Sequence, residues 1–396
     1  MGKTILMHID LNAFFATAET IAHPEYQGKP LVVAGLDRRG IVSTANYEAR
    51  KYGIHSAMPT YQAMRLCPSL IVCPPHFSLY SRLSKEFFAF VRNYSPLIEV
   101  ASIDECYVDM TIPLTNCKDV PGYLKEMQQA LFDKTGLGCS IGIAKTKFLA
   151  KMGSDMKKPM GITIIRNRDI PSMIYPLPIQ SMFGIGKKTA PKLEKLGVKK
   201  IGDLLTFPPE TLKEVMGKFY YTAMDWLKGK GDDQIDMSEW NPKSVGRSRT
   251  LLYDTNDSEE ILEMVRHLCH MVSDDMKEEE KYGTVVTLSW KDRDFRMHSK
   301  SVTIEEPIQD YLPLFQIAKK LTTYIPSTLW IRLIGVSVSG LLDPKEMIVQ
   351  MTLFNYEEHE EKAQTKLIIS DVNRKMKKDL LFRASELKKK GKEKKK

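Results

Sequence analysis

The first 165 residues alternate between short apolar runs and amphipathic stretches. Apolar runs of strand length occupy residues 4–9, 98–110 and 139–143, and the spacing of apolar positions becomes helical at residues 80–94 and 122–135. Strands that alternate with amphipathic helices bury one face against those helices. The pattern therefore predicts an α+β unit in which helices pack on one face of a small antiparallel sheet.

The rest of the chain has a different pattern. Residues 167–232 show helical spacing throughout, and residues 233–243 have the polar composition of a linker. A second α+β unit is predicted after this linker. Its expected strands are residues 245–253, 283–292, 296–304 and 331–340, and its expected helices are residues 258–280 and 311–324.

Two adjacent carboxylates, Asp104 and Glu105, interrupt the apolar run at residues 98–110. Neighbouring side chains on a regular strand point to opposite faces, so the pair can share one ion only where the strand bends. An acidic, solvated hairpin turn explains the same pattern. Asp10 ends the first apolar run and supplies a second acidic strand end. Because carboxylate oxygens suit hard divalent cations, the three acids favour a Mg2+ site.

Charge and composition indicate the kind of binding partner and the cellular compartment. The net charge of +9 suggests an anionic partner, but residues 371–396 carry +8 of it, which leaves +1 for residues 1–370. Any nucleic-acid surface must therefore come from segregating charge to one face, and the role of the Lys-rich terminus stays open. Six cysteines without a Cys-x-x-Cys pair indicate a reduced cytoplasmic setting and no structural zinc, and no apolar run is long enough for a membrane.

Three motifs follow one another in the chain: HIDLNAFFATAE at residues 8–19, STANYEAR at residues 43–50 and ASIDE at residues 101–105. Together they resemble the Y-family translesion DNA polymerases, closest to the DNA polymerase IV branch. The resemblance extends from residue 1 to about residue 343. It implies a right-hand polymerase fold with palm, fingers, helical thumb and a separate α+β little finger domain.

The resemblance also implies boundaries for these domains. They are palm, residues 1–10 and 75–166; fingers, residues 11–74; thumb with a helix-hairpin-helix, residues 167–232; linker, residues 233–243; little finger, residues 244–343; and C-terminal tail, residues 344–396.

For the metal site, the resemblance implies that Asp10, Asp104 and Glu105 are catalytic and hold two Mg2+ ions. The backbone carbonyl of Leu11 is expected to contribute a further ligand. Many relatives in this branch carry Asp where this chain has Asn12, so Asn12 is given no metal role.

For the incoming nucleotide, Tyr47 and Arg50 lie three residues apart and share one face if the segment is helical. A hydroxyl and a planar cation suit a triphosphate. In the resembled family, the second aromatic of the Phe14–Phe15 pair excludes a 2'-hydroxyl, which indicates Phe15 here. The expected dNTP contacts are Phe14, Phe15, Thr44, Tyr47, Arg50 and Lys158.

Two glycines at 184 and 186 are typical of a helix-hairpin-helix, whose backbone amides approach a DNA phosphate closely. Little finger arginines are expected to follow the DNA backbone. Residues 350–354 resemble the short peptide with which bacterial polymerases dock on the sliding clamp. The predicted DNA contacts are Gly184, Gly186, Lys187, Lys188, Arg247 and Arg249, and the predicted clamp contacts are Gln350, Leu353 and Phe354.

These expectations describe a template-directed DNA polymerase that performs low-fidelity translesion synthesis by two-metal nucleotidyl transfer, without proofreading. Its expected partners are primer-template DNA, dNTPs and the sliding clamp. We expect a monomer in the cytoplasm, associated with the nucleoid. The alternatives are a non-catalytic DNA-binding scaffold with a polymerase-like fold, and a palm-domain nucleotide cyclase, which would not need a helix-hairpin-helix.

Overall fold

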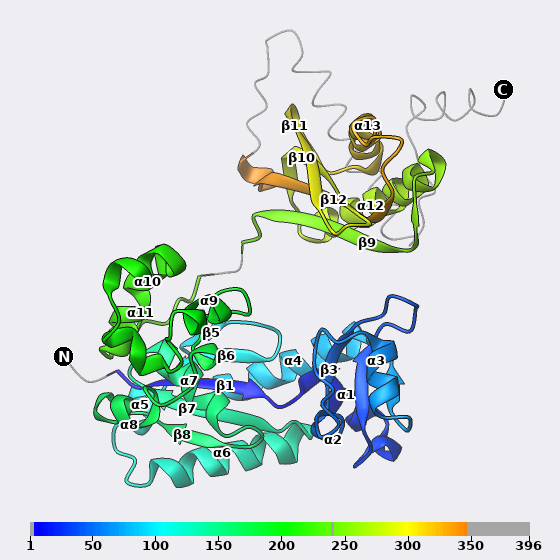
Figure 1. Ribbon diagram of the computed structural model, residues 1–396. Helices are drawn as coiled ribbons and strands as arrows, with labels where there is room; N and C mark the ends of the chain where they lie inside the picture. Colours follow the sequence, from blue (N-terminus) through cyan, green and yellow to red (C-terminus); the bar gives the residue numbers. More distant parts are fainter. Residues whose placement is uncertain (1–3, 239–240, 347–396) are drawn as a thin grey trace, which may run out of the picture. The chain divides into compact units, whose positions relative to one another are not determined.

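The computed structural model describes residues 4–238 and 241–346. The chain divides into two compact units, Met1–Trp240 and Asn241–Lys396, and the division falls within the predicted linker (Figure 1). The predicted clamp peptide at residues 350–354 and the Lys-rich terminus lie outside the described residues. None of the described helices combines the length and the apolar character that a bilayer-spanning helix needs.

A five-stranded sheet forms the palm, in the order β5-β6-β1-β7-β8. The central strand β1 pairs antiparallel with both β6 and β7. The strands are β1 (Leu6–Leu11), β5 (Ile98–Val100), β6 (Glu105–Asp109), β7 (Cys139–Ala144) and β8 (Ile162–Ile164).

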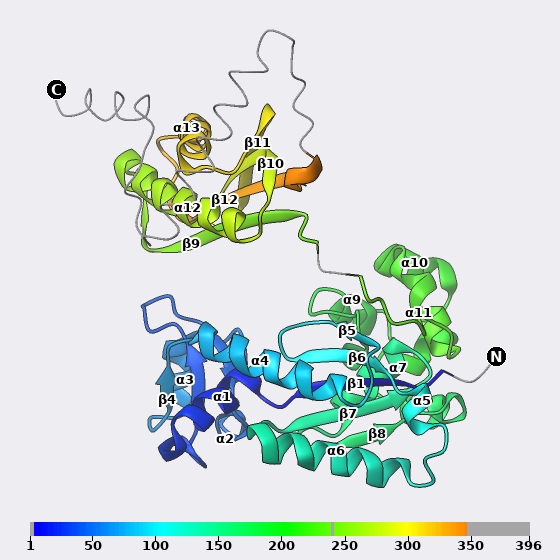
Figure 2. The same cartoon turned by 180° about the vertical axis from the view of Figure 1, so that it is seen from behind.

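The sequence predicts an antiparallel sheet with helices on one face, and the structure corrects both parts of this prediction: one edge pair is parallel, and a helix also covers the other face (Figure 1). Helix α7 (Lys147–Met156) crosses from β7 to β8, so these two strands run parallel. Helix α7 also covers the face opposite α4 (Phe77–Arg92) and α6 (Val120–Thr135) (Figures 1 and 2). It lies so close to the sheet that a Cβ on Gly142 would be 1.9 Å from the Ala150 carbonyl oxygen.

The alternation of β1 decides which side chains meet α7. Met7, Ile9 and Leu11 join the core beneath α4 and α6. His8 and Asp10 point to the other face because successive strand residues alternate. The polar residues of this buried strand therefore gather on the α7 side of the palm.

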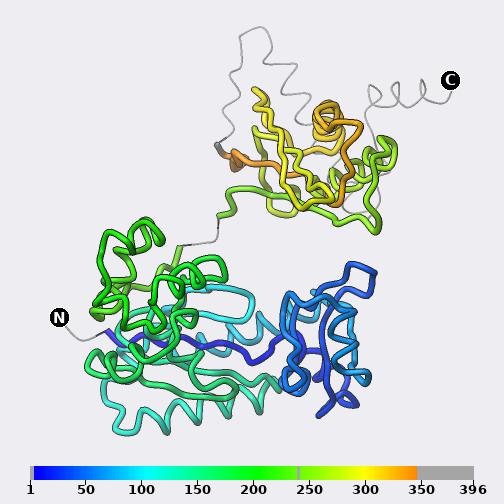
Figure 3. Tube along the Cα trace, in the orientation of Figure 1, coloured from blue at the N-terminus to red at the C-terminus, as the bar shows by residue number. Residues whose placement is uncertain are grey.

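A smaller sheet, in the order β3-β2-β4, forms the fingers beside the palm. Figure 3 follows the chain from β1 out to this sheet and back along α4 into the palm. The first helix after β1, α1, contributes to the palm core. The elements are α1 (Phe14–Ala22), β2 (Leu31–Ala34), β3 (Val42–Ala45), α2 (Tyr47–Arg50), α3 (Thr60–Leu66) and β4 (Ile71–Cys73), with a 3-10 turn at Pro24–Tyr26.

The thumb is helical, as its apolar spacing indicates, and shares a hydrophobic core with α7. Its helices are α8 (Ile170–Met173), α9 (Ala190–Lys195), α10 (Pro209–Met216) and α11 (Phe219–Leu227), with 3-10 turns at Asn167–Asp169, Ile179–Ser181 and Ile201–Leu205. The short α5 (Thr111–Leu114) belongs to the palm.

The second unit is an antiparallel sheet in the order β11-β10-β12-β9, packed against two helices. Every strand and helix predicted from its sequence pattern is present. They are β9 (Ser244–Thr255), α12 (Ser258–Glu278), β10 (Tyr282–Asp292), β11 (Met297–Ile308), α13 (Tyr311–Thr322) and β12 (Ile331–Leu342), followed by a 3-10 turn at Pro344–Glu346.

Candidate active site

Asp10 and Glu105 are direct partners in the register of β1 and β6. Residues opposite each other in an antiparallel pair project from the same face, which here is the face that α7 covers. Together with His8, they offer ligand atoms that all lie within 4.8 Å of one another. The register thus brings together two acids that are 95 positions apart in the sequence.

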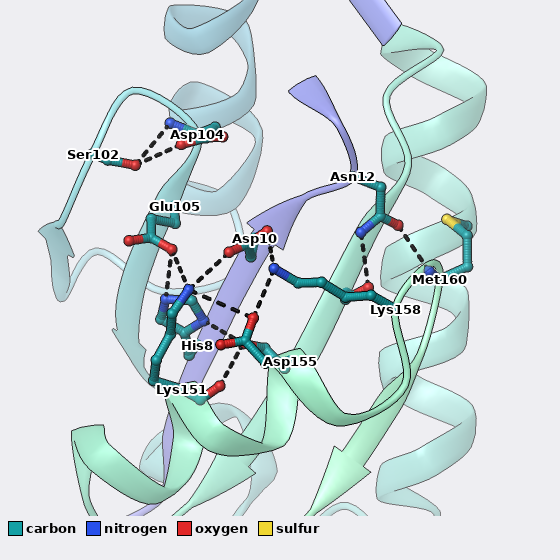
Figure 4. Close-up of polar contacts among 12 residues, drawn as sticks. His8, Asp10, Asn12, Ser102, Asp104, Glu105, Lys151, Asp155, Lys158 and Met160 are labelled. Atoms are coloured by element: carbon teal, nitrogen blue, oxygen red, sulfur yellow. Dashed lines mark hydrogen bonds and ion pairs between the residues drawn. The ribbon is translucent and has the colours of Figure 1, made fainter. Parts of the chain in front are cut away.

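Two lysines neutralise this acidic pair (Figure 4). The Lys151 Nζ lies 2.9 Å from Asp10 Oδ2 and 2.5 Å from Glu105 Oε2. The Lys158 Nζ lies 2.7 Å from Asp10 Oδ1 and 2.8 Å from Asp155 Oδ1. Both oxygens of Asp10 therefore accept from a cation, and the Lys151 ammonium bridges the two carboxylates.

The electrostatics of the cluster follow from this pairing. Burial raises the pKa of Glu105, but the neighbouring His8, Asp10 and Lys151 together outweigh it and hold that pKa well below its usual range. Burial lowers the pKa of Lys151, whereas Asp10, Glu105 and Asp155 together raise it well above the ordinary lysine value. The site accordingly stabilises positive charge between its two carboxylates, as a cation-binding site must.

His8 supports this cluster from within the sheet. Its ring is fully buried and contacts the ring of Tyr107, at a centroid separation of 4.7 Å. Its Nδ1 is 2.8 Å from the Ser154 hydroxyl, which donates to the Lys151 carbonyl. Its Nε2 lies 3.4 Å from Glu105 Oε2. His8 thus links the acidic strand to the helix that carries Lys151.

Asp104 stands apart from Asp10 and Glu105. Its carboxylate accepts from the Ser102 hydroxyl at 2.6 Å, and its carbonyl accepts from the Leu11 amide at 3.0 Å. Burial raises the pKa of Asp104, and the charges of Asp10 and Glu105 raise it further. Asp104 precedes the first residue of β6, so its side chain leaves the chain in a different direction from that of Glu105.

Asn12 makes structural hydrogen bonds at the end of β1. Its amide group donates to the Ser140 hydroxyl at 2.8 Å, and its carbonyl oxygen accepts from the Met160 amide at 2.8 Å (Figure 4). Its side chain is almost fully buried. Asn12 therefore fastens the loop that carries Lys158 to the end of β1.

The fingers bring further nucleotide candidates into this neighbourhood. Burial raises the pKa of Tyr47, the charges of Arg50 and Lys158 oppose this, and the charge of Asp10 adds to it. Tyr47 is therefore within electrostatic reach of Asp10. The Arg50 guanidinium lies 4.6 Å from the centre of the Tyr47 ring, and its Nε donates to the backbone. Thr44 precedes this pair on β3, and Phe14 and Phe15 begin α1.

The thumb hairpin has one glycine that its fold requires and one that it does not. Gly184 has a φ of +89°, and a Cβ there would lie 2.4 Å from the Phe219 ring. A Cβ on Gly186 would instead lie in open space, with no other heavy atom within 4 Å. Lys187 and Lys188 follow on the exposed surface before α9. An approach of another molecule to the backbone is thus possible at Gly186.

In the second unit, Arg247 and Arg249 lie on the helix-covered side of β9. Their partners in β12 are Val336 and Ile334, which are core residues, and opposite residues share a face. The Arg247 guanidinium makes two hydrogen bonds with Asp275 of α12, at 2.5 and 2.7 Å. The strand pattern had not indicated this partner.

Sequence reasoning overlooked three residues of the site: His8, Lys151 and Asp155. His8 lies two positions before Asp10, which is the spacing of one strand face. Lys151 and Asp155 lie four positions apart, which is the spacing of one helix face. The sequence contains these spacings, but they do not reveal that this face of α7 packs against this face of β1.

Comparison with known proteins agrees with this geometry. The sequence matches the impB/mucB/samB family over residues 9–155, the IMS family HHH motif over residues 167–198 and the impB/mucB/samB family C-terminal domain over residues 242–353. DNA polymerase IV 1 of Bacillus subtilis (strain 168) is 37% identical over 392 residues, which are 98% of this chain and 94% of the relative. DNA polymerase IV of Bacillus anthracis is 37% identical over 389 residues, which are 97% of this chain and 93% of the relative.

Solved structures share the fold. The Y-family DNA polymerase chimera Dbh-Dpo4(243-245)-Dbh is 28% identical and has a TM-score of 0.78, covering 86% of this chain and 99% of its own. A structure described as an insertion ternary complex of Dbh DNA polymerase has a TM-score of 0.60 with the same coverage. A palm sheet with paired carboxylates, a fingers sheet, a helical thumb and a second α+β unit define a right-hand polymerase. The chain belongs to the Y family of DNA polymerases, in the DNA polymerase IV branch.

Proposed function

We infer that this protein is a template-directed DNA polymerase of the translesion type. The observation that carries the inference is the register that places Asp10 opposite Glu105, with Lys158 beside them. Paired carboxylates at adjacent strand ends, next to a cation that can bind phosphate, are what nucleotidyl transfer requires. The relatives named DNA polymerase IV, similar over nearly the full chain, support the same activity.

The residues present fit divalent cations. The donors of Asp10 and Glu105 are hard carboxylate oxygens, and the Lys151 ammonium shows that positive charge is stable between them. We propose that Asp10, Asp104, Glu105 and the Leu11 carbonyl hold two Mg2+ ions. When bound, these ions would lower the pKa of the primer 3'-hydroxyl and neutralise the triphosphate and the leaving pyrophosphate. Lys151 must then leave its bridging position, and Asp104 must turn from Ser102.

The chain's own residues have the following proposed roles. Lys158, Tyr47, Arg50 and Thr44 bind the triphosphate of the incoming dNTP, while Phe14 and Phe15 adjoin its sugar. The thumb holds primer-template DNA at phosphates through amides and lysines, without reading the sequence. These DNA contacts are Gly184, Gly186, Lys187 and Lys188, with Arg247 and Arg249 added by the second unit. We further propose a cytoplasmic, nucleoid-associated monomer that docks on the sliding clamp through Gln350, Leu353 and Phe354.

Extension of a labelled primer on a template tests this function. The purified wild type is expected to extend the primer with dNTPs and Mg2+, whereas Glu105→Gln is expected to lose at least about 1,000-fold in rate while still binding DNA. Glu99→Gln is the matched control, because Glu99 is a similarly exposed palm carboxylate that pairs with Lys147. A wild type that binds primer-template but never extends it would favour the non-catalytic scaffold.

A further inference from the structure

One buried carboxylate has no part in the site described above. Glu19, on α1, has no exposed surface, whereas Asp10 and Asp292, the other buried acids among the described residues, are 8% and 4% exposed. A carboxylate in an apolar core is costly unless hydrogen bonds compensate for its lost hydration. Glu19 therefore needs partners, and the position of these partners suggests its purpose.

Its partners come from the start of α4. The Tyr80 hydroxyl donates to Glu19 Oε1 at 2.5 Å, and the His76 Nδ1 lies 3.0 and 3.1 Å from the two oxygens. Burial raises the pKa of Tyr80, and the bond to Glu19 raises it further, so the hydroxyl keeps its proton and remains a donor. Tyr80 is itself completely buried. The carboxylate thus fixes the far end of a ring that cannot move into solvent.

The same ring lies against Phe15. Phe15 and Glu19 are four residues apart on α1 and therefore share one face of that helix. Tyr80 spans both positions: its hydroxyl binds Glu19, and its ring stacks on Phe15 with centroids 4.2 Å apart and planes inclined by 12°. Phe77 meets the Phe15 ring edge-on at 6.2 Å. Phe15 thus has a rigid aromatic wall behind it.

We propose that Glu19 is a positioning residue that, through Tyr80, fixes the Phe15 ring and so sets the selection of deoxyribose over ribose. The proposal rests on the proposed function, in which Phe15 adjoins the sugar of the nucleotide. Steric exclusion of one hydroxyl works only if the excluding ring cannot retreat. Without the Glu19 hydrogen bond, the Tyr80 ring can tilt, and Phe15 gains room to move away from a 2'-hydroxyl.

The test compares kcat/KM for single incorporation of a dNTP and of the matching rNTP by the full chain. Glu19→Met keeps the volume but removes the hydrogen bonds with Tyr80 and His76, and its dNTP-to-rNTP ratio is expected to fall about tenfold. Glu19→Gln keeps an oxygen that accepts from Tyr80, so its ratio is expected to stay within about twofold of the wild type. Tyr80→Phe removes only the hydroxyl and is expected to resemble Glu19→Met.

Two further variants separate positioning from general destabilisation. Ser95→Ala removes two hydrogen bonds, from the Ser95 hydroxyl to the Asp109 carbonyl at 2.7 Å and from the Leu97 amide to that hydroxyl at 3.3 Å, and should leave the ratio unchanged. The double variant Glu19→Met/Tyr80→Phe should select no worse than either single variant, because both act through one contact.

Equal loss of dNTP and rNTP incorporation in Glu19→Met and Tyr80→Phe would overturn the proposal, as would additive effects in the double variant. If Glu19→Met does not fold, Tyr80→Phe decides alone. A wild type that incorporates no dNTP would instead overturn the proposed function.

Discussion

The Lys151 ammonium lies 2.5 Å from the Glu105 carboxylate and is only 13% exposed. The same nitrogen reaches Asp10, so one ammonium bridges two neighbouring acids, of which Asp10 also pairs with Lys158. Divalent cations, once bound, would take over this role. We therefore expect Lys151 to stabilise the metal-free palm more than the metal-bound palm.

Lys151→Met is expected to destabilise the metal-free protein by about 3 kcal/mol, because it leaves Glu105 without its lysine partner and Asp10 with Lys158 alone. Mg2+ or Mn2+ should then raise the melting temperature more in the variant than in the wild type. Thermal melts in EDTA and in each metal measure both effects.

Lys147→Met is the matched control for that experiment. Lys147 lies one turn earlier on α7, is also 13% exposed and also pairs with two acids, Glu99 and Asp232. The Lys147→Met variant should be less stable than the wild type, but metal ions should raise its melting temperature by the same amount as in the wild type. An equal metal-induced shift in both variants would show that Lys151 does not occupy the cation position.

Asn12→Leu is expected to weaken dNTP binding, since it removes the bond that holds the Lys158 loop at the end of β1 and the bond to Ser140 of β7. The buried Ser140 hydroxyl loses its partner, which costs about 1–3 kcal/mol, and the partly buried Met160 amide loses its partner at a smaller cost. The KM for dNTP should rise much more than kcat falls. Asn12→Asp still accepts from the Met160 amide and can accept from the Ser140 hydroxyl, so its KM should stay close to that of the wild type.

The two hairpin glycines are expected to respond differently to alanine. Gly184→Ala should destabilise the thumb by about 1–2 kcal/mol or more, because its positive φ is unfavourable for alanine and its Cβ would meet Phe219. Gly186→Ala should leave the melting temperature unchanged but weaken DNA binding, because the new methyl group occupies the space that a phosphate would enter. Unchanged DNA affinity in Gly186→Ala would contradict the proposed phosphate contact.

The Asp232 ion pair predicts a pH effect on stability. Burial raises the pKa of Asp232, but the hydrogen bonds from Lys147 and the Gln234 amide, together with the Lys147 charge, outweigh burial and lower the net value. A carboxyl whose pKa is lowered on folding stabilises the fold above its unfolded pKa, and this contribution is lost as the pH falls. Because the side chain is 60% exposed, Asp232→Asn should cost only about 0.5 kcal/mol at pH 7.

The difference in the free energy of unfolding between wild type and Asp232→Asn should vanish when the pH falls below the ordinary carboxyl range. Both chains then carry a neutral group at position 232. Urea unfolding from pH 7 to pH 3 measures it. Asp233→Asn is the control, since Asp233 makes no ion pair in the part of the chain that the structure describes. A constant difference between Asp232→Asn and wild type over this range would contradict the assignment.

Local sequence patterns are sufficient to predict most of the strands and helices and the acidic character of the site. Alternation along β1 separates Met7, Ile9 and Leu11 from the face of His8 and Asp10, because the strand period is two. Local spacing also revealed the helical thumb and the second α+β unit. These features depend on residues close together in the chain, so the pattern contains them.

The patterns do not predict which of these faces meet, and this follows from the folded chain. The pairing register sets Asp10 against Glu105 rather than Asp104, and the α7 crossover adds a parallel edge strand and brings Lys151 between the acids. Contacts such as Tyr80 with Glu19, 61 positions apart, arise from packing of helices whose individual patterns do not specify a partner. Long-range register and packing are collective properties of the folded chain, and local periodicity carries no information about them.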